Sequence, residues 1–220
     1  MTKRLYLIII ASLLIFLSIS YGLHSLGYVN IHYTKNDNLF FEGKIALVPF
    51  GEIRNSEVQY VKAQIEKFYG FEVDVLNRAK MPANAFYKPR SRYKASKVLD
   101  HLIATKSVEY DKVIALSNDD ISAKVKGYKD WGVIGLAYLG NSACIVSTYR
   151  LGKQKVSSDR FKSRLAKASL HELGHTLGLP HCDRTDYCFM NDAKGKVSTI
   201  DRANLTLCDY CQKQILIYQL

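Results

Sequence analysis

Several features are missing from this 220-residue chain, and the absences narrow its class. It has no internal repeat and no low-complexity tract, which argues against a repeat or fibrous protein. Bases outnumber acids by 31 to 20, but they are dispersed and no nucleic-acid-binding motif accompanies them. We therefore expect no nucleic-acid partner, and the excess of bases suits anionic membrane headgroups or acidic peptides instead.

The first 30 residues contain no acidic side chain. Lys3 and Arg4 precede an uncharged run that approaches the ~20 residues needed to span a bilayer. Residues 1–23 are therefore predicted to be a signal anchor, with the two bases on the cytoplasmic side. The alternative is a cleaved signal peptide with Ser18-Ile19-Ser20 as its cleavage site. No cysteine lies near the end of the run, which excludes a bacterial lipoprotein.

Both alternatives place the rest of the chain outside the cytoplasm, either anchored to the membrane or exported to a space such as the periplasm. Residues 24–41 are polar and mixed, and we predict a linker there. Residues 42–220 are enough for one domain with its own core, which we expect to be a monomer.

Hydrophobic periodicity predicts strands alternating with helices in this domain. The predicted strands are 44–50, 71–77, 112–117, 132–138 and 143–149, and the predicted helices are 55–68, 91–106, a long one beginning at Ser157 or Ser158, and 209–216. Residues 79–90 and the stretch after His181 are predicted to be loop. The order indicates an α/β (α+β) fold, in which helices back a mixed twisted sheet.

The segment His171–His181 reads H-E-x-x-H-x-x-G-x-x-H. On a helix, His171 and His175 lie one turn apart on one face and can share a zinc ion. Gly178 can adopt positive φ and turn the chain so that His181 returns as a third ligand. Three protein ligands leave a position open for water, which is typical of catalytic zinc, and Glu172 is placed to act as general base.

A second group consists of four cysteines that follow the histidines: Cys182, Cys188, Cys208 and Cys211. Two pairs separated by a longer loop are typical of a closed, structural zinc site. The alternatives are two disulfides, which an oxidising compartment would allow, or a redox C-x-x-C motif, for which no thioredoxin-like context is present. Cys144 lies in an apolar run and is predicted to be buried.

These motifs together resemble the archaemetzincin family of zinc metallopeptidases. Similar segments occur at 44–50, 135–140 and 146–151, so that the resemblance extends over about residues 44–216. It implies a metzincin-like fold with an active-site helix and a zinc-stapled, cysteine-rich C-terminal region. It also implies two zinc ions per chain, and a turn at Met190 that forms the floor beneath the catalytic metal.

Two departures from the family are visible. Five residues, rather than four, separate the first two cysteines, and most family members lack an apolar N-terminal segment. No cysteine precedes Cys144 to act as a latency switch.

We expect zinc-dependent hydrolysis of a peptide or protein substrate that lies along an edge strand near Gly135. The alternatives are a catalytically silent, zinc-stabilised peptide-binding domain, and a membrane-tethered chaperone or adaptor. The sequence does not give the cleavage specificity, nor whether the enzyme is an endopeptidase or an aminopeptidase.

Overall fold

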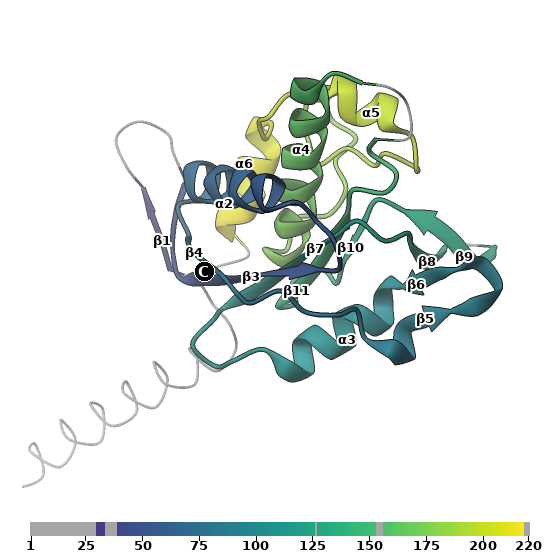
Figure 1. Cartoon of the computed structure of the whole chain (residues 1–220). Coiled ribbons are helices and arrows are strands. Elements are labelled where there is room, and N and C mark those ends of the chain that lie inside the picture. Colours follow the sequence, from purple (N-terminus) through teal and green to yellow (C-terminus); the bar gives the residue numbers. More distant parts are fainter. Residues whose placement is uncertain (1–29, 34–38, 126, 153–155, 218–220) are drawn as a thin grey trace, which may run out of the picture.

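The computed structural model describes residues 30–33, 39–125, 127–152 and 156–217 (Figure 1). Its centre is a five-stranded sheet with the strand order β10-β11-β7-β3-β4. The strands are β3 (Lys44–Phe50), β4 (Glu72–Val75), β7 (Lys112–Ser117), β10 (Gly135–Ala137) and β11 (Ala143–Ser147). β4, β3, β7 and β11 pair in parallel, whereas β10 pairs antiparallel with β11.

Helices cover both faces of this sheet, with α2 and α4 on one side and α3 on the other (Figure 1). Their bounds are α2 (Asn55–Tyr69), α3 (Ala95–Thr105), α4 (Ser158–Thr176), α5 (Val197–Arg202) and α6 (Asp209–Ile217). Neighbouring residues of a strand point to opposite faces. Ile45 and Leu47 therefore join the core under α2 and α4, while Ala46 joins the core under α3. Apolar side chains on both faces explain why these strands read as continuous hydrophobic runs.

A second sheet, which the sequence analysis did not predict, has the order β5-β6-β8-β9. Its strands are β5 (Phe86–Tyr87), β6 (Arg92–Lys94), β8 (Ile121–Val125) and β9 (Tyr128–Val133). Because β6 pairs with β5 and β8, the helix predicted over 91–106 begins only at Ala95. The predicted loop 79–90 also contains two short 3-10 helices, Ala83–Ala85 and Lys88–Arg90.

The segment expected to be a linker contains two strands. β1 (Asn30–Tyr33) and β2 (Leu39–Glu42) pair antiparallel, and Phe41 is buried against Tyr69 and Phe71. Burial of an aromatic ring stabilises this part of the segment against the domain, so it is not a linker without a core. The predicted anchor or signal peptide at 1–23 lies outside the described residues. Among the described helices, none is long and apolar enough to cross a bilayer.

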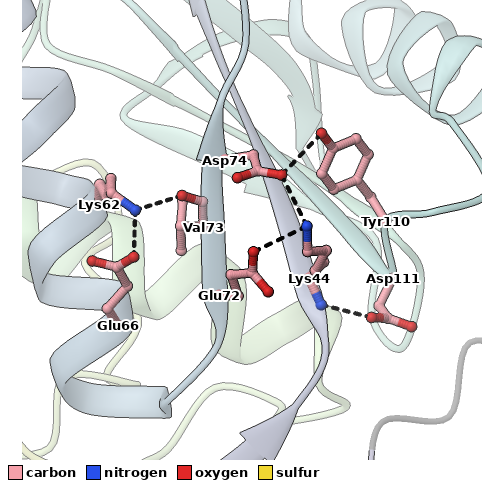
Figure 2. A network of polar contacts seen from close by, with 8 residues as sticks. All are labelled: Lys44, Lys62, Glu66, Glu72, Val73, Asp74, Tyr110 and Asp111. Carbon is pink, nitrogen blue, oxygen red and sulfur yellow. Dashed lines mark hydrogen bonds and ion pairs between the residues drawn. The ribbon is translucent and has the colours of Figure 1, made fainter.

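The edge strand β4 is covered with charge. Lys44 on β3 forms ion pairs with Glu72 and Asp74 on β4, and Lys62 on α2 donates to the Val73 carbonyl (Figure 2). The Tyr110 hydroxyl also donates to Asp74 (Figure 2). Charged side chains on an edge strand discourage the addition of a further strand. The opposite edge, β10, is different, and it borders the site described next.

Candidate active site and metal centres

Helix α4 carries the first two histidines of the motif. Ser157 caps its N-terminus by accepting a hydrogen bond from the Arg160 N–H, as the sequence predicts. Near its middle, buried Arg164 bonds both carboxylate oxygens of Asp201 on α5 (2.7 and 2.6 Å) and the Leu151 carbonyl (2.8 Å). These bonds hold the helix in one register against the surrounding loops.

The three histidines converge at the C-terminal end of α4. The Nε2 atoms of His171 and His175 are 3.0 Å apart. Gly178 has φ of 90°, so the chain turns as predicted and brings His181 back to the pair. One ring nitrogen from each histidine lies within 4.8 Å of the other two, a spacing at which the three can hold one ion.

Hydrogen bonds at Nδ1 orient the imidazole rings of His171 and His175. Nδ1 of His171 lies 2.7 Å from the Phe189 carbonyl, and Nδ1 of His175 lies 2.6 Å from the Leu179 carbonyl. In these two rings Nδ1 therefore carries the proton and Nε2 presents a lone pair. Burial, together with the neighbouring imidazoles, lowers the pKa of His171 to about 3, and burial lowers the pKa of His175 to about 4. Both rings are then neutral near pH 7, as a metal ligand requires.

Nδ1 of His181 faces a carboxylate rather than a carbonyl. It lies 4.0 Å from Oδ2 of Asp192, in the loop that follows Met190. Carboxylates orient metal-binding histidines through hydrogen bonds, and the separation here is longer than a hydrogen bond. No motif spacing marks Asp192 in the sequence.

Glu172 is buried beside the histidines and packs against a strand that has no side chain there. Burial raises the pKa of its carboxyl to about 8. A Cβ placed on Gly135 of β10 would lie 2.7 Å from the Glu172 carboxyl carbon and overlap Oε1. Gly135 therefore creates the space in which the carboxyl group lies, a role that the sequence alone did not reveal.

Met190 lies in a tight turn beneath α4. The turn is closed by a bond of 3.1 Å from the Asn191 N–H to the Cys188 carbonyl. Met190 is fully buried, and a Cβ on Gly174 would lie 2.7 Å from its sulfur. The Cys182 N–H also donates to the Met190 carbonyl at 2.9 Å. Met190 therefore lies in a tight turn packed against α4, and its role as the floor beneath the catalytic metal stays a prediction from the resemblance.

Lys112 is a second residue whose place the sequence did not reveal. It lies at the start of β7, and its Nζ donates to the Thr176 carbonyl at 2.9 Å and to the Asn141 carbonyl at 3.2 Å. Thr176 ends α4, so a buried cation caps the last turn of the helix beside His175. Burial lowers the pKa of Lys112 to about 8.

The histidines and Glu172 open onto a cleft of about 630 Å³. It runs along β10 and reaches β8, β9 and the loop 192–195. Within the described residues β10 pairs only with β11, so its other edge is free to face the cleft. The cleft also contains Tyr128, Trp131 and Lys194, none of which the sequence analysis singled out.

The four cysteines form a separate cluster immediately beyond His181. Sulfur atoms of Cys182 and Cys208 are 3.7 Å apart, and those of Cys188 and Cys211 are 3.8 Å apart. A disulfide would require about 2.05 Å, and all four cysteines are free. A tetrahedral zinc with Zn–S bonds of about 2.3 Å separates its sulfurs by about 3.8 Å. The donor set therefore fits a zinc ion.

The thiol of Cys188 lies in an environment that favours thiolate, whereas burial raises the pKa of Cys182 and the hydrogen bond with Cys188 raises the pKa of Cys211. Hydrogen bonds from the Cys211 thiol and from the Cys208 N–H lower the pKa of Cys188 to about 5. Metal binding requires such deprotonated sulfur. Cys144 is buried in β11, as predicted, and lies outside the cluster.

Comparison with known proteins assigns the family. Residues 46–216 match peptidase family M54. The archaemetzincin of Halobacterium salinarum is 35% identical over 179 residues, which cover 78% of this chain and 99% of that protein. The crystal structure of archaemetzincin from Methanopyrus kandleri superposes with a TM-score of 0.69 at 30% identity and covers 85% of this chain and 98% of that one. That from Archaeoglobus fulgidus, complexed with malonate, gives a TM-score of 0.67 at 27% identity over 78% and 99% of the two chains. The chain therefore belongs to peptidase family M54, the archaemetzincins, and is a zinc metallopeptidase.

Proposed function

We propose that this enzyme hydrolyses peptide bonds with a zinc ion held by His171, His175 and His181 and with Glu172 as general base. The observation that carries the proposal is the meeting of these four side chains in one cleft beside the free edge of a strand. The neutral, pre-oriented imidazoles and the open side toward the cleft suit a catalytic metal rather than a structural one.

The substrate would add to the sheet as an extended strand along β10. Gly135, Leu136 and Ala137 line the cleft, and their free edge offers backbone groups for pairing. The opposite edge of the same sheet does not offer this, because Lys62 and the ion pairs of Lys44 cover β4. The contrast supports β10 as the binding edge.

Zinc, when bound, supplies acidification of a water molecule and polarisation of the scissile carbonyl. Glu172 takes the proton from the attacking water as its oxygen bonds to the carbonyl carbon. The same carboxyl then gives that proton to the nitrogen as the C–N bond breaks, so that a carboxylic acid and an amine leave. Burial raises the pKa of this carboxyl to about 8, and the positive charge of a zinc ion beside it would lower that pKa, so that the carboxylate form would be present to accept the proton.

For the cysteine cluster we propose a second zinc that is structural. All four cysteines are buried, at most 6% exposed, which suits a closed site from which substrate is kept out. Membrane attachment or export through residues 1–23 stays a prediction from the sequence.

The test is a comparison of Glu172→Gln with wild type in the full chain purified in detergent. We expect kcat/KM on a mixed peptide library to fall by about 10²–10⁴-fold, with metal content and melting temperature unchanged. Exposed Glu109→Gln is the matched control and should behave as wild type. Full activity in the metal-loaded Glu172→Gln variant would overturn the assignment, and a wild-type protein that binds zinc but cleaves no peptide would indicate a silent binding domain.

A further inference from the structure

Two exposed aromatic rings stand on one wall of the cleft. Tyr128 and Trp131 of β9 have 58% and 42% of their surface exposed, and their ring centres are 4.9 Å apart. Val125 of β8 lies beside them, with 41% exposed. Large apolar side chains gathered at the surface usually mark a binding site, and these line the same cleft as the histidines.

A β-bulge brings the two rings to the same face. Tyr128 and Trp131 are three residues apart, so a regular strand would point them in opposite directions. The pairing of Ala123 with Trp131 and of Val125 with Tyr128 shows that β9 has one extra residue between these two pairs. Bulges beside active sites re-aim side chains in this way. The bulge therefore places both aromatic rings on the face of β9 that lines the cleft.

Ion pairs hold the other face of the bulged strand. Asp130, between the two aromatic residues, bonds Lys94 and lies 3.8 Å from Arg92, both on β6. Close by, Arg150 forms an ion pair of 2.9 Å with Asp120, the residue before β8. These ion-paired side chains are largely buried and hold one face of β9 in place. The rings of Tyr128 and Trp131 lie on the other face, toward the cleft.

The loop 192–195, on the opposite side of the cleft, lies close to Trp131. A Cβ on Gly195 would lie 3.5 Å from the indole nitrogen of Trp131, so the indole rests close to this loop. Lys194 and Gly195 both have positive φ (46° and 74°), and the Lys194 N–H donates to Asp192 at 2.8 Å. A non-glycine residue in this conformation is uncommon and often occurs at functional sites.

We propose that Tyr128 and Trp131 form a subsite that selects a large apolar side chain, preferably aromatic, at one position of the peptide. The selected residue lies on the side of the histidines where β10 begins, because β9 leads directly into β10. Lys124 and Lys194 border the subsite and disfavour a basic side chain there. The inference rests on the proposed peptidase function and adds its substrate class.

Trp131 is the one tryptophan of the chain, so intrinsic fluorescence reports on this subsite directly. The probes are blocked octapeptides of alanine and serine in which a single phenylalanine is moved along the chain. They are titrated into the zinc-loaded full-length Glu172→Gln variant. We expect phenylalanine at one position to shift Trp131 emission to shorter wavelength and to tighten binding about tenfold relative to the peptide without it. Lysine at that position should abolish the shift.

Two variants separate the subsite from a general surface effect. Tyr128→Ala should weaken the phenylalanine peptide about tenfold. Phe86→Ala removes an aromatic ring that is 47% exposed on the same sheet but lies outside the cleft, and it should change neither binding nor emission. An emission that no phenylalanine position alters would overturn the proposal.

Turnover gives an independent readout. Wild type should favour phenylalanine over alanine at the same position about tenfold in kcat/KM, and Trp131→Ala should remove most of that ratio. An emission shift without any cleavage would keep the subsite and reject the peptidase proposal. Cleavage with neither an emission shift nor a phenylalanine preference would reject the subsite and leave the peptidase proposal intact.

Discussion

The histidine cluster and the cysteine cluster are neighbours in the chain, since Cys182 directly follows His181, yet their surroundings are opposite. The side chain of His181 is half exposed, and its cluster opens onto a cleft. All four cysteines are at most 6% exposed and none lines that cleft. On the function proposed here, ligand type and burial, rather than position in the chain, would separate a catalytic metal from a structural one.

The largest loss of stability is expected from substitutions in the cysteine cluster. In Cys208→Ser/Cys211→Ser, two of four thiolates are lost, and structural zinc contributes about 10 kcal/mol or more to folding in small domains. That exceeds or matches the whole stability of a typical domain. We expect unfolded or aggregated protein by circular dichroism. Cys144→Ala, a buried cysteine outside the cluster, should stay folded with both metals. A double variant that melts like wild type would mean that the cysteines hold no structural metal.

Loss of one ligand from the histidine cluster should abolish activity without unfolding the protein. We expect His175→Ala to retain the cysteine metal, with zinc content falling from two to one per chain, and to lose at least about 10³-fold in kcat/KM, since both metal and orientation are lost. The melting temperature should change far less than in the cysteine variant. Unfolding of the His175→Ala variant would contradict a catalytic role for the histidine cluster and a structural role for the cysteine cluster.

A smaller effect is expected from a substitution at Gly135, which packs against Glu172. The added methyl of Gly135→Ala overlaps the Glu172 carboxyl group and must displace it. We predict a 10- to 100-fold loss in kcat, because a misplacement of about 1 Å can cost about 10²-fold, with zinc content unchanged. Gly152→Ala is the control, because its Cβ would meet only Phe161 at 3.5 Å. Wild-type kcat in Gly135→Ala would show that the strand does not position Glu172.

The smallest effect concerns pH. Lys112, with a pKa of about 8 in the fold against an ordinary 10.5, binds a proton more weakly in the folded than in the unfolded chain. Its charge therefore costs stability below pH 8, and this cost is relieved as pH rises from about 8 to 10.5, by at most about 1.4 kcal/mol per unit.

Lys112→Met should remove that rise from the free energy of unfolding measured by denaturant titration. Asp111, Lys106 and Cys144, which also influence the pKa of Lys112, are present in both proteins, so the difference between the two curves isolates this lysine. Parallel curves over this range would contradict the assignment.

Much of this architecture could be predicted because the signals are local. The apolar strands at 44–50 and 112–117, the amphipathic helix at 55–68 and the capped helix from Ser157 all appear as expected. The histidine motif specifies its own geometry through helix periodicity and Gly178. These features depend on residues close together in the sequence.

The second sheet and the walls of the cleft depend on contacts between distant segments. β6 looked like the first turn of a helix, and only its pairing with β8 makes it a strand. The contact of Gly135 with Glu172 and the bond from Lys112 to Thr176 join residues 37 and 64 positions apart in the chain. Such tertiary contacts override local propensity, and no motif spacing encodes them.

Stepwise zinc removal, followed by native mass spectrometry, activity and circular dichroism on one sample, would test directly whether the two clusters hold metals with different roles. We predict two zinc ions per chain. The first ion to leave on mild chelation should come from the exposed histidine cluster, and activity should fall in proportion while the circular dichroism signal stays constant. The second should leave only as the fold is lost. A single zinc per chain, or activity that persists until the protein unfolds, would contradict the assignment of a catalytic and a structural metal.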